Sequence, residues 1–543
     1  MTESLGTWDY IVIGAGSAGC VVASRLSENP SHRVLLLEAG PDDGNPWLHI
    51  PVGYARTFHD SRFNWKFSTS PDPGINGRTS YWPRGRVLGG SSSINAMVFS
   101  RGQHSDYDDW EQLGAEGWSW RDVAPYFRRL EDAAFTGHPL RGRGGPMPVA
   151  EVSGEAHPVN PSFLEGCREL GFACNGDYNA ESSEGVGYYQ INTRHGLRVS
   201  AAKAYLRPAM KRKNLRVLTG ALVHRLEFGS RSCTAVVFEW KGRRVHAMPG
   251  REAILSAGAI GSPMILQRSG IGDAKMLKSH GIEVVKQAPQ VGRNLQDHLG
   301  ISYFYRSRIP TLNDELNSLS GRIRAGLKYL LFRSGPLSVS VNQSGGFVRS
   351  SLESERPNVQ LYLQAMSYLD CPPGARPMIR LDRQSAFSIG TSQCRPTSRG
   401  TIRIASADPQ AKPIIDPGYL STEHDVREAL EAARLIRRIA ATDSMRRIIE
   451  NEILPGDAVQ ADDELLEDFR NRADTVFHPS CTCRIGQDYR QSVVNPRLMV
   501  HGMENVRVID ASVFPVLPTG NINAPTIMVG EKGADFVLAD AKR

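Results

Sequence analysis

The segment from residue 9 to residue 40 restricts the fold more than any other part of the chain. An apolar, β-branched run at 9–13 (DYIVI) leads directly into the glycine-rich sequence GAGSAG at 14–19. A helical pattern follows, and residues 32–40 (HRVLLLEAG) then indicate a second buried strand. A strand, a glycine turn, a helix and a second strand within about 30 residues are typical of the first unit of a doubly wound, parallel α/β sheet that binds a nucleotide.

Each glycine of this turn has a mechanical role in nucleotide binding. Gly14 permits the tight turn, Gly16 lets backbone N–H groups approach a diphosphate, and Gly19 lets the helix pack closely on the strand. The helix N-terminus presents unpaired N–H groups and the positive end of its dipole to the phosphates. Glu38 stands where an acid accepts hydrogen bonds from ribose hydroxyls, and a carboxylate there disfavours the 2′-phosphate of NADP. The predicted dinucleotide contacts are Gly14, Gly16, Ser17, Ala18, Gly19, Glu38 and Ala39.

The motif alone does not separate NAD from FAD. Its position close to the start of a chain of 543 residues favours FAD, and so does the absence of a second such loop for a nicotinamide nucleotide. We therefore expect FAD as the cofactor.

Composition excludes several classes of protein. Hydrophobic residues make up 40% and charged residues 22%, with a mean hydropathy of −0.33, which excludes a mostly disordered chain and a membrane bundle. The net charge of +7 is a mild excess without a lysine-rich tail, so no nucleic-acid partner is expected. Eight scattered cysteines without a CxxC motif favour reduced thiols over disulfides or a metal site. With no basic leader at residues 1–9 and no apolar run of ~18 residues, we expect a soluble, cytoplasmic protein.

Local patterns predict further elements along the chain. The sequence GRVLGGSSSIN at 85–95 offers backbone N–H groups and small side chains for a close ligand contact, although its local chemistry equally fits an ordinary serine-rich loop. We expect a helix at 121–131, strands within 214–228, a strand, glycine turn and helix at 251–272, strands of a separate sheet at 357–366 and 400–406, an amphipathic helix at 424–442, and a buried strand within 506–515 that rejoins the nucleotide domain.

Five motifs, in order along the chain, resemble those of the glucose-methanol-choline (GMC) oxidoreductases. Beside the N-terminal GAGSAG with its following Glu38, GRVLGGSSSIN at 85–95 and GAIGSPMILQRSGIG at 258–272 are similar to the two signatures of that family. VFHPSCTCRIG at 476–486 and TGNINAPTIMVGEKGAD at 520–535 resemble its two C-terminal catalytic segments. The resemblance covers nearly the whole chain, which looks most like the bacterial alcohol and choline dehydrogenases of the family.

The resemblance implies a mixed α/β fold with two domains. A discontinuous, Rossmann-like FAD-binding domain would comprise residues 1–154, 201–300 and 496–543. A substrate-binding domain with a large antiparallel sheet would comprise residues 155–200 and 301–495. The resemblance also implies FAD-dependent oxidation of an alcohol to the aldehyde or ketone, with oxygen or a quinone-like or dye acceptor taking the electrons.

The resemblance further implies roles for individual residues. His478 matches the catalytic histidine of the family and would take the hydroxyl proton, since an imidazole has a pKa near neutrality. Asn521 stands at the partner position, and because an amide is no strong base it would hold the substrate oxygen by hydrogen bonding. No metal ligand is expected. The other positions carried over as FAD contacts are Trp65, Gly89, Gly90, Asn95, Val98, Val223, Asp510, Ala511, Asn523 and Thr526.

Three departures from the family pattern carry information. Ile94 stands where some choline-oxidising relatives have a histidine bonded covalently to FAD, so the FAD is expected to be noncovalent. Gln343 replaces a frequent Glu that could pair with a cationic substrate, which favours a neutral, primary alcohol over choline. Ser480 and Cys481 replace a Val-Gly pair, and their hydroxyl and thiol groups could polarise the surroundings of His478.

The sequence leaves several alternatives open. Hydroxynitrile lyases share this fold and keep FAD without net oxidation, and choline stays an alternative substrate. The basic, amphipathic sequence at 321–335 is able to lie on an anionic membrane surface or to pack as a solvated helix on the substrate domain. Weak peripheral contact with the inner membrane therefore stands beside a purely cytoplasmic location, and the oligomeric state is open.

Overall fold

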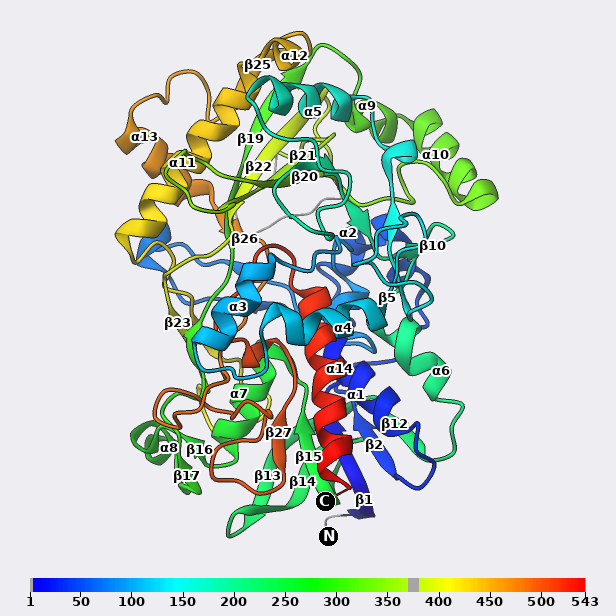
Figure 1. Cartoon of the computed structure of the whole chain (residues 1–543), viewed down its shortest axis with the longest axis vertical. Coiled ribbons are helices and arrows are strands. Elements are labelled where there is room, and N and C mark those ends of the chain that lie inside the picture. The colour runs from blue at the N-terminus through cyan, green and yellow to red at the C-terminus, as the bar shows by residue number, and fades with distance from the viewer. Residues whose placement is uncertain (1–2, 370–379, 543) are drawn as a thin grey trace.

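The computed structural model describes residues 3–369 and 380–542, which form two stacked parts (Figure 1). In Figure 1 the lower part contains both ends of the chain and a sheet built around β1 (Glu3–Ile13). The upper part contains a second sheet built around β19 (Leu299–Ser307). Within the described ranges, no helix combines the length and apolarity that crossing a membrane requires.

The lower sheet has seven strands in the order β12-β2-β1-β15-β14-β13, with β27 paired to β15. β1 is parallel to both of its neighbours, β2 and β15, and its residues Tyr10 to Ile13 are buried because the sheet is covered on its faces. The parallel pairing of β27 with β15 confirms that the C-terminal strand rejoins the nucleotide domain. The other strands are β2 (Val34–Leu37), β12 (Leu215–Leu218), β13 (Ala221–Gly229), β14 (Ser232–Trp240), β15 (Arg243–Leu255) and β27 (Val506–Val508).

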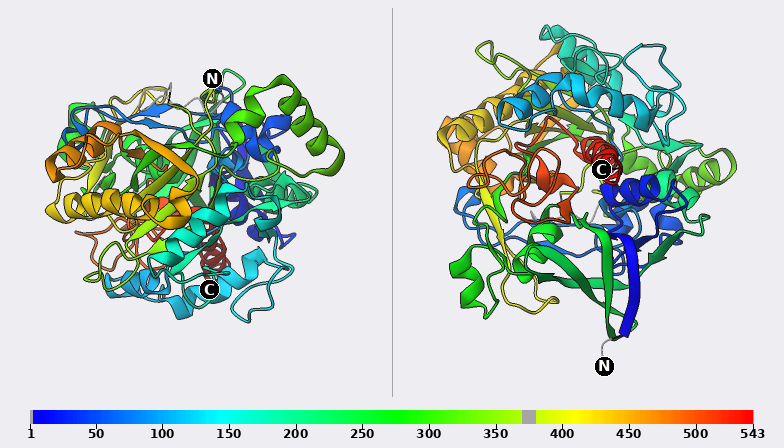
Figure 2. Two further views of the ribbon diagram at one scale, coloured as in Figure 1. Left: turned by 90° about the horizontal axis from the view of Figure 1, so that it is seen from above. Right: turned by 60° about the horizontal axis from the view of Figure 1, so that its bottom comes forward.

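Helix α1 (Ser17–Leu26) packs against β1 and β2, and helix α14 (Asn523–Asp540) lies along α1. The right-hand view of Figure 2 shows the red C-terminal helix beside the blue α1, although the two are separated by some 500 residues of sequence. A methyl group added at Gly530 would lie only 3.0 Å from the Cβ atom of Val21. The glycine therefore permits the close approach that joins the first and last helices of the chain.

The upper sheet is antiparallel throughout, with the order β20-β21-β22-β19-β25 and with β26 paired to β19. Helix α11 (Glu423–Ala440) packs against β22 through Ala429, Ala433 and Ile436, which are buried. The remaining strands of this sheet are β20 (Asn342–Val348), β21 (Val359–Gln364), β22 (Ala386–Gln393), β25 (Ile449–Leu454) and β26 (Asp474–Thr475).

The structure corrects the sequence prediction in this part in one respect. Residues 357–366 and 400–406 were expected in one separate sheet, but β21 belongs to the upper sheet and β23 (Gly400–Arg403) to another. β23 pairs with β18 (Arg293–Leu295) and β24 (Ile414–Asp416) in a three-stranded sheet. Alternation of apolar residues predicts a strand but does not specify its partner, which long-range pairing decides. The exact limits of the two domains stay a prediction.

Candidate active site

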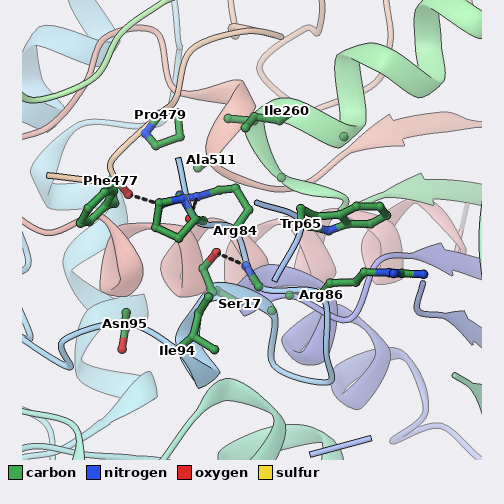
Figure 3. A pocket seen from close by; sticks show the side chains of 18 of the residues that line it. Ser17, Trp65, Arg84, Arg86, Ile94, Asn95, Ile260, Phe477, Pro479 and Ala511 are labelled. Carbon is green, nitrogen blue, oxygen red and sulfur yellow. Dashed lines mark hydrogen bonds between the residues drawn. The ribbon is translucent and has the colours of Figure 1, made fainter. Parts of the chain in front are cut away.

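One continuous cavity of about 690 Å³ lies between the two parts and receives residues from both sheets. On the lower side it opens at the carboxyl ends of β1, β2 and β15, the edge at which parallel α/β sheets bind their ligands. In Figure 3, Trp65 and Arg86 lie at one end of the cavity, and Phe477 and Asn95 lie towards the other. The cavity is therefore elongated enough to hold a ligand with two distinct ends.

Three helix N-termini meet at this cavity. α1 begins at Ser17, α7 (Gly258–Arg268) begins at Gly258, and α14 begins at Asn523, and these first residues all line the cavity. Helix N-termini carry unpaired N–H donors and a partial positive charge, so their convergence favours a polyanion such as a diphosphate. The residues present thus fit the phosphate portion of FAD.

Glycines bring the phosphate-binding loops into direct contact. Gly14 has φ +98°, and a Cβ atom there would lie 2.6 Å from the carbonyl oxygen of Ser256. Gly90 has φ +54°, and a Cβ atom there would lie 2.7 Å from the Cα atom of Gly16. Side chains at Gly14 and Gly90 would therefore push the loops apart and close the floor of the cavity.

Two predicted cofactor residues do not line the cavity. A Cβ atom at Gly19 would lie 1.9 Å from the carbonyl oxygen of Gly14, and one at Gly89 would lie 2.2 Å from the hydroxyl of Ser93. Both positions therefore require glycine for packing behind the binding surface, which for Gly19 is the mechanical role that the motif predicts, whereas the additional prediction of ligand contact is not met by the cavity lining. The remaining predicted positions line the cavity: Gly14, Gly16, Ser17, Ala18, Glu38, Ala39, Trp65, Gly90, Asn95, Val98, Val223, Asp510, Ala511, Asn523 and Thr526.

The Glu38 carboxylate is held in place by backbone donors. Its two oxygens accept hydrogen bonds from the N–H groups of Ala15 and Gly40, each at 2.8 Å. Burial nevertheless raises the pKa of Glu38 to about 7. Because the carboxylate lines the cavity as well, it is oriented to accept further hydrogen bonds from a ligand.

Asp510 and Asn523 have partners within the protein. One oxygen of Asp510 accepts hydrogen bonds from Gly258 N–H at 2.8 Å and from the Ser262 hydroxyl. The Ser17 hydroxyl donates to the side-chain oxygen of Asn523 at 2.8 Å. Asp510 therefore orients the first turn of α7, and Asn523 connects the first residues of α1 and α14.

His478 and Asn521 meet across the cavity wall, although they are remote from each other in sequence. Nε2 of His478 and Nδ2 of Asn521 are 3.1 Å apart, and both residues line the cavity. The other ring nitrogen of His478, Nδ1, is 2.9 Å from Nδ1 of His298, a residue that sequence analysis did not single out. Nε2 of His298 is 2.8 Å from the carbonyl oxygen of Cys394.

These contacts determine the position of the protons on both imidazoles. A carbonyl oxygen only accepts, so neutral His298 carries its proton on Nε2 and has a lone pair on Nδ1. His478 must then donate from Nδ1, which leaves its Nε2 as a lone pair that faces the cavity and Asn521. Burial lowers the pKa of His298 to about 4, so His298 is neutral over the physiological pH range.

A second chain of hydrogen bonds orients the Asn521 amide. Its oxygen accepts a hydrogen bond from Nε2 of Gln360 at 3.3 Å, and the Gln360 oxygen accepts one from the Tyr362 hydroxyl at 2.7 Å. The amide nitrogen of Asn521 is thereby directed at His478 Nε2. One proton acceptor and one proton donor thus face the same point, which fits a hydroxyl group that donates to His478 and accepts from Asn521.

Arg84 is a second residue that sequence analysis missed. Its guanidinium lines the cavity and donates to the carbonyl oxygen of Phe477 at 2.7 Å, as Figure 3 shows. Burial lowers the pKa of His478 well below its usual value, and His298 and the positive charge of Arg84 lower it further. His478 is therefore neutral, as a proton acceptor must be. The only local signal for Arg84 was its place in the loop before the Gly-Ser-rich signature.

The structure places Gln343 differently from the sequence prediction. Its side-chain oxygen accepts hydrogen bonds from His157 N–H at 2.8 Å and from the Asn160 amide at 2.9 Å, and it does not line the cavity. The adjacent Asn342 lines the cavity instead, and the pairing of β20 with β21 is irregular here: Asn342 pairs with Gln364 and Ser344 with Leu363, so Gln343 is an extra, unpaired residue whose side chain is directed elsewhere. The argument from Gln343 for a neutral substrate is therefore wrong as stated.

The Ser480 hydroxyl and the Cys481 thiol, which were expected to polarise the surroundings of His478, contact each other and Gln296. The Ser480 hydroxyl is 3.2 Å from the Cys481 sulfur, which in turn lies 3.4 Å from the side-chain oxygen of Gln296. Both residues are fully buried, and burial raises the pKa of the Cys481 thiol to about 12. Their contacts fix the packing around Gln296 rather than polarise His478.

Ile94, the third departure from the family pattern, lines the cavity with a buried, purely aliphatic side chain.

Comparison with known proteins identifies the class of protein that this fold and site define. The GMC oxidoreductase family models match residues 8–300 and 396–530, and the chain belongs to that family. It is therefore an FAD-dependent oxidoreductase of the class that acts on alcohol donors.

Individual relatives cover almost the whole chain. An alcohol dehydrogenase (acceptor) from Pseudomonas putida is 41% identical over 98% of this chain and 96% of its own length. The mitochondrial choline dehydrogenase of Homo sapiens is 40% identical over 99% of this chain and 90% of its own length. A solved structure that concerns FAD modification in formate oxidase from Aspergillus oryzae has a TM-score of 0.92, 26% identity and full coverage of both chains.

Proposed function

We propose that the protein oxidises a neutral primary alcohol and that His478 is the general base. The observation that carries the proposal is the pair of opposed groups in the cavity: the lone pair on His478 Nε2 and the N–H donor of Asn521, 3.1 Å apart. A substrate hydroxyl that contacts both groups from the cavity side, in place of their direct hydrogen bond, would donate its proton to His478 and accept from Asn521. Positioning both partners in advance lowers the entropic cost of reaching the reactive geometry.

FAD, when bound in the cavity, supplies the acceptor for the hydride that leaves the substrate α-carbon. The residues proposed to bind it are the cavity-lining positions named above, with Glu38 at the ribose and the three helix N-termini at the diphosphate. Ile94 offers no atom for a covalent bond to the cofactor, which supports noncovalent binding. Oxygen or a quinone-like molecule is proposed to take the electrons.

The preference for a neutral substrate is now supported by the cavity wall. Among the described residues that line the cavity, the acids are Glu38, Glu239 and Asp510, all on the lower side. The upper sheet contributes neutral residues instead, among them Asn342, Tyr362 and Gln364. A cationic substrate would lose its hydration without gaining a carboxylate partner, which costs several kcal/mol for an unpaired buried ion.

The test compares two alcohols of nearly the same shape. Choline and its uncharged carbon isostere, 3,3-dimethylbutan-1-ol, are each mixed anaerobically with the holoenzyme while flavin absorbance is recorded. We expect the uncharged alcohol to bleach the flavin at least tenfold more efficiently, since tenfold corresponds to about 1.4 kcal/mol. A preference for choline would refute the neutral substrate, and an absence of bleaching by every alcohol tested would favour a lyase instead.

A matched pair of variants tests which residue determines the preference for the uncharged alcohol over choline. Asn342→Asp introduces a carboxylate into the cavity wall. The side-chain oxygen of Asn342 already accepts a hydrogen bond from Nε2 of Gln364 at 2.9 Å, and an aspartate oxygen is able to keep it. Gln343→Glu introduces the same charge on the neighbouring residue, which does not line the cavity. We expect Asn342→Asp to narrow the gap between the two alcohols and Gln343→Glu to leave it unchanged.

A further inference from the structure

Helix α10 (Leu319–Phe332) exposes an unusual amount of apolar surface. Six of the fourteen exposed large hydrophobic side chains in the described part of the chain belong to this one helix. Their exposed fractions range from 52% for Leu327 to 73% for Phe332. Exposed apolar side chains are ordinary when scattered, but a contiguous group marks an interaction site. Leu319, Ile323, Leu327, Leu330 and Leu331 fall within about 120° of the helix circumference at ~100° per residue and are called the α10 face below, whereas Phe332 is exposed at the C-terminal end of the helix.

The opposite side of the helix is anchored to the protein. Gly321, Ala325 and Tyr329 are buried, and the Tyr329 hydroxyl donates to the carbonyl oxygen of Gly196 at 2.9 Å. The helix projects from the body in Figure 1 and in the left-hand view of Figure 2. The α10 face therefore points outward because its own packing already uses the other side, and no described element covers it.

Positive charge borders the α10 face. The sequence from Leu319 to Arg333 contains four basic residues and no acid. With about 100° per residue, Arg322 and Arg324 lie on the two borders of the apolar stripe. Both are exposed, and among the described residues neither is paired with a carboxylate; the Arg322 guanidinium donates to the carbonyl oxygen of Asn317 at 3.1 Å. Lys328 lies 3.5 Å from Glu155 in an exposed ion pair.

We propose that the α10 face docks this protein onto an anionic lipid bilayer. An apolar stripe bordered by arginines matches the interface of such a membrane, where aliphatic side chains enter the acyl region and guanidinium groups reach the phosphates. A second copy of this chain is disfavoured as the occupant, since a two-fold contact would bring the same cations together. The proposal does not depend on the identity of the substrate.

Docking would bring the substrate-side wall of the cavity close to the membrane. The segment after α10 leads, nine positions beyond Phe332, to Val341 and then Asn342, which line the cavity. The same segment is bound to the loop before α2 (Tyr54–Thr57), because Val52 N–H donates to the carbonyl oxygen of Leu337 at 3.4 Å. Tyr54 also lines the cavity.

Vesicle flotation of the FAD-loaded, full-length protein tests the proposal. Vesicles of phosphatidylcholine alone are compared with vesicles of phosphatidylcholine and phosphatidylglycerol in equal parts, at low and high salt. We expect the protein to float with the anionic vesicles and to lose most of that binding at high salt, because salt screens the arginines. Failure to float with anionic vesicles at low salt would overturn the proposal.

Surface variants separate the apolar and the electrostatic contributions to vesicle binding. The triple variant Ile323→Ser, Leu327→Ser, Leu331→Ser should weaken binding at least tenfold, and Arg322→Gln with Arg324→Gln should abolish the preference for anionic vesicles. The control, Leu113→Ser with Leu352→Ser, removes two apolar residues elsewhere that are at least 54% exposed and should bind like the wild type. Flavin content and flavin reduction by alcohol verify that each variant is folded.

Two results would contradict the assignment of the α10 face. Flotation of the triple variant at the wild-type level would show that another surface binds lipid. A wild-type dimer in light scattering that the triple variant converts to a monomer would show that a second copy covers the face instead.

Discussion

The strongest test of the active-site geometry is a substitution at His298, a residue that does not itself line the cavity. His298 accepts the Nδ1 proton of His478 only because its own Nε2 donates to the carbonyl oxygen of Cys394. We expect His298→Leu to leave that Nδ1 proton without an acceptor in a fully buried site. His478 would then favour the other tautomer, whose Nε2 carries the proton and has no lone pair for the substrate.

The size of the effect follows from the cost of an unsatisfied buried donor. That cost is about 1–3 kcal/mol, which disfavours the productive tautomer by about five- to 150-fold. The limiting rate of flavin reduction by alcohol should fall by that factor in anaerobic stopped-flow measurements. Substrate affinity and flavin content should change little, because His298 contacts neither in the proposed arrangement.

A conservative variant distinguishes tautomer control from a general loss of structure. In the His298→Asn variant, the side-chain oxygen of the new asparagine is able to accept the His478 proton, so this variant should recover most of the rate. Two outcomes would refute the reasoning: His298→Leu that reduces its flavin at the wild-type rate, or His298→Asn that is as slow as His298→Leu while flavin content stays normal.

Three further predictions follow from the same site. His478→Ala should slow flavin reduction by about 10²–10⁴-fold with FAD still bound. In the wild type, the rate of flavin reduction should be flat around neutral pH and fall only well below pH 6.5, since the imidazole protonates as the pH drops through its lowered pKa. Stopped-flow reduction measured across pH would contradict this if the rate fell near pH 7. Glu38→Ala should lose FAD during purification, because two backbone donors lose their acceptor along with the proposed ribose contact; normal flavin-to-protein absorbance ratios would exclude that role. Acid precipitation should release the flavin into the supernatant, since Ile94 has no attachment atom, and yellow colour that stays in the pellet would disprove noncovalent binding.

Features that depend on short stretches of chain were predictable from the sequence alone. The glycine turn at 14–19 works through backbone conformation and helix geometry over a few residues, so its strand, helix and acid could be located without a structure. The positions of His478 and Asn521 came from their motifs, and the structure brings both to one cavity. Most of the predicted cofactor residues line that cavity for the same reason.

Tertiary structure alone decided the features that depend on which groups face one another. Nothing near His298 in the sequence indicates a partner for His478, because that contact joins two loops 180 residues apart and its proton is set by a carbonyl of a third segment. The direction of Gln343 depends on the irregular pairing of β20 with β21, where an extra, unpaired residue changes which side chains face the cavity. The amphipathic pattern of α10 likewise predicts a helix with an apolar side but does not specify its orientation. Packing of Gly321, Ala325 and Tyr329 against the body turns the larger apolar side outward, since a helix buries the face that fits its neighbours most closely.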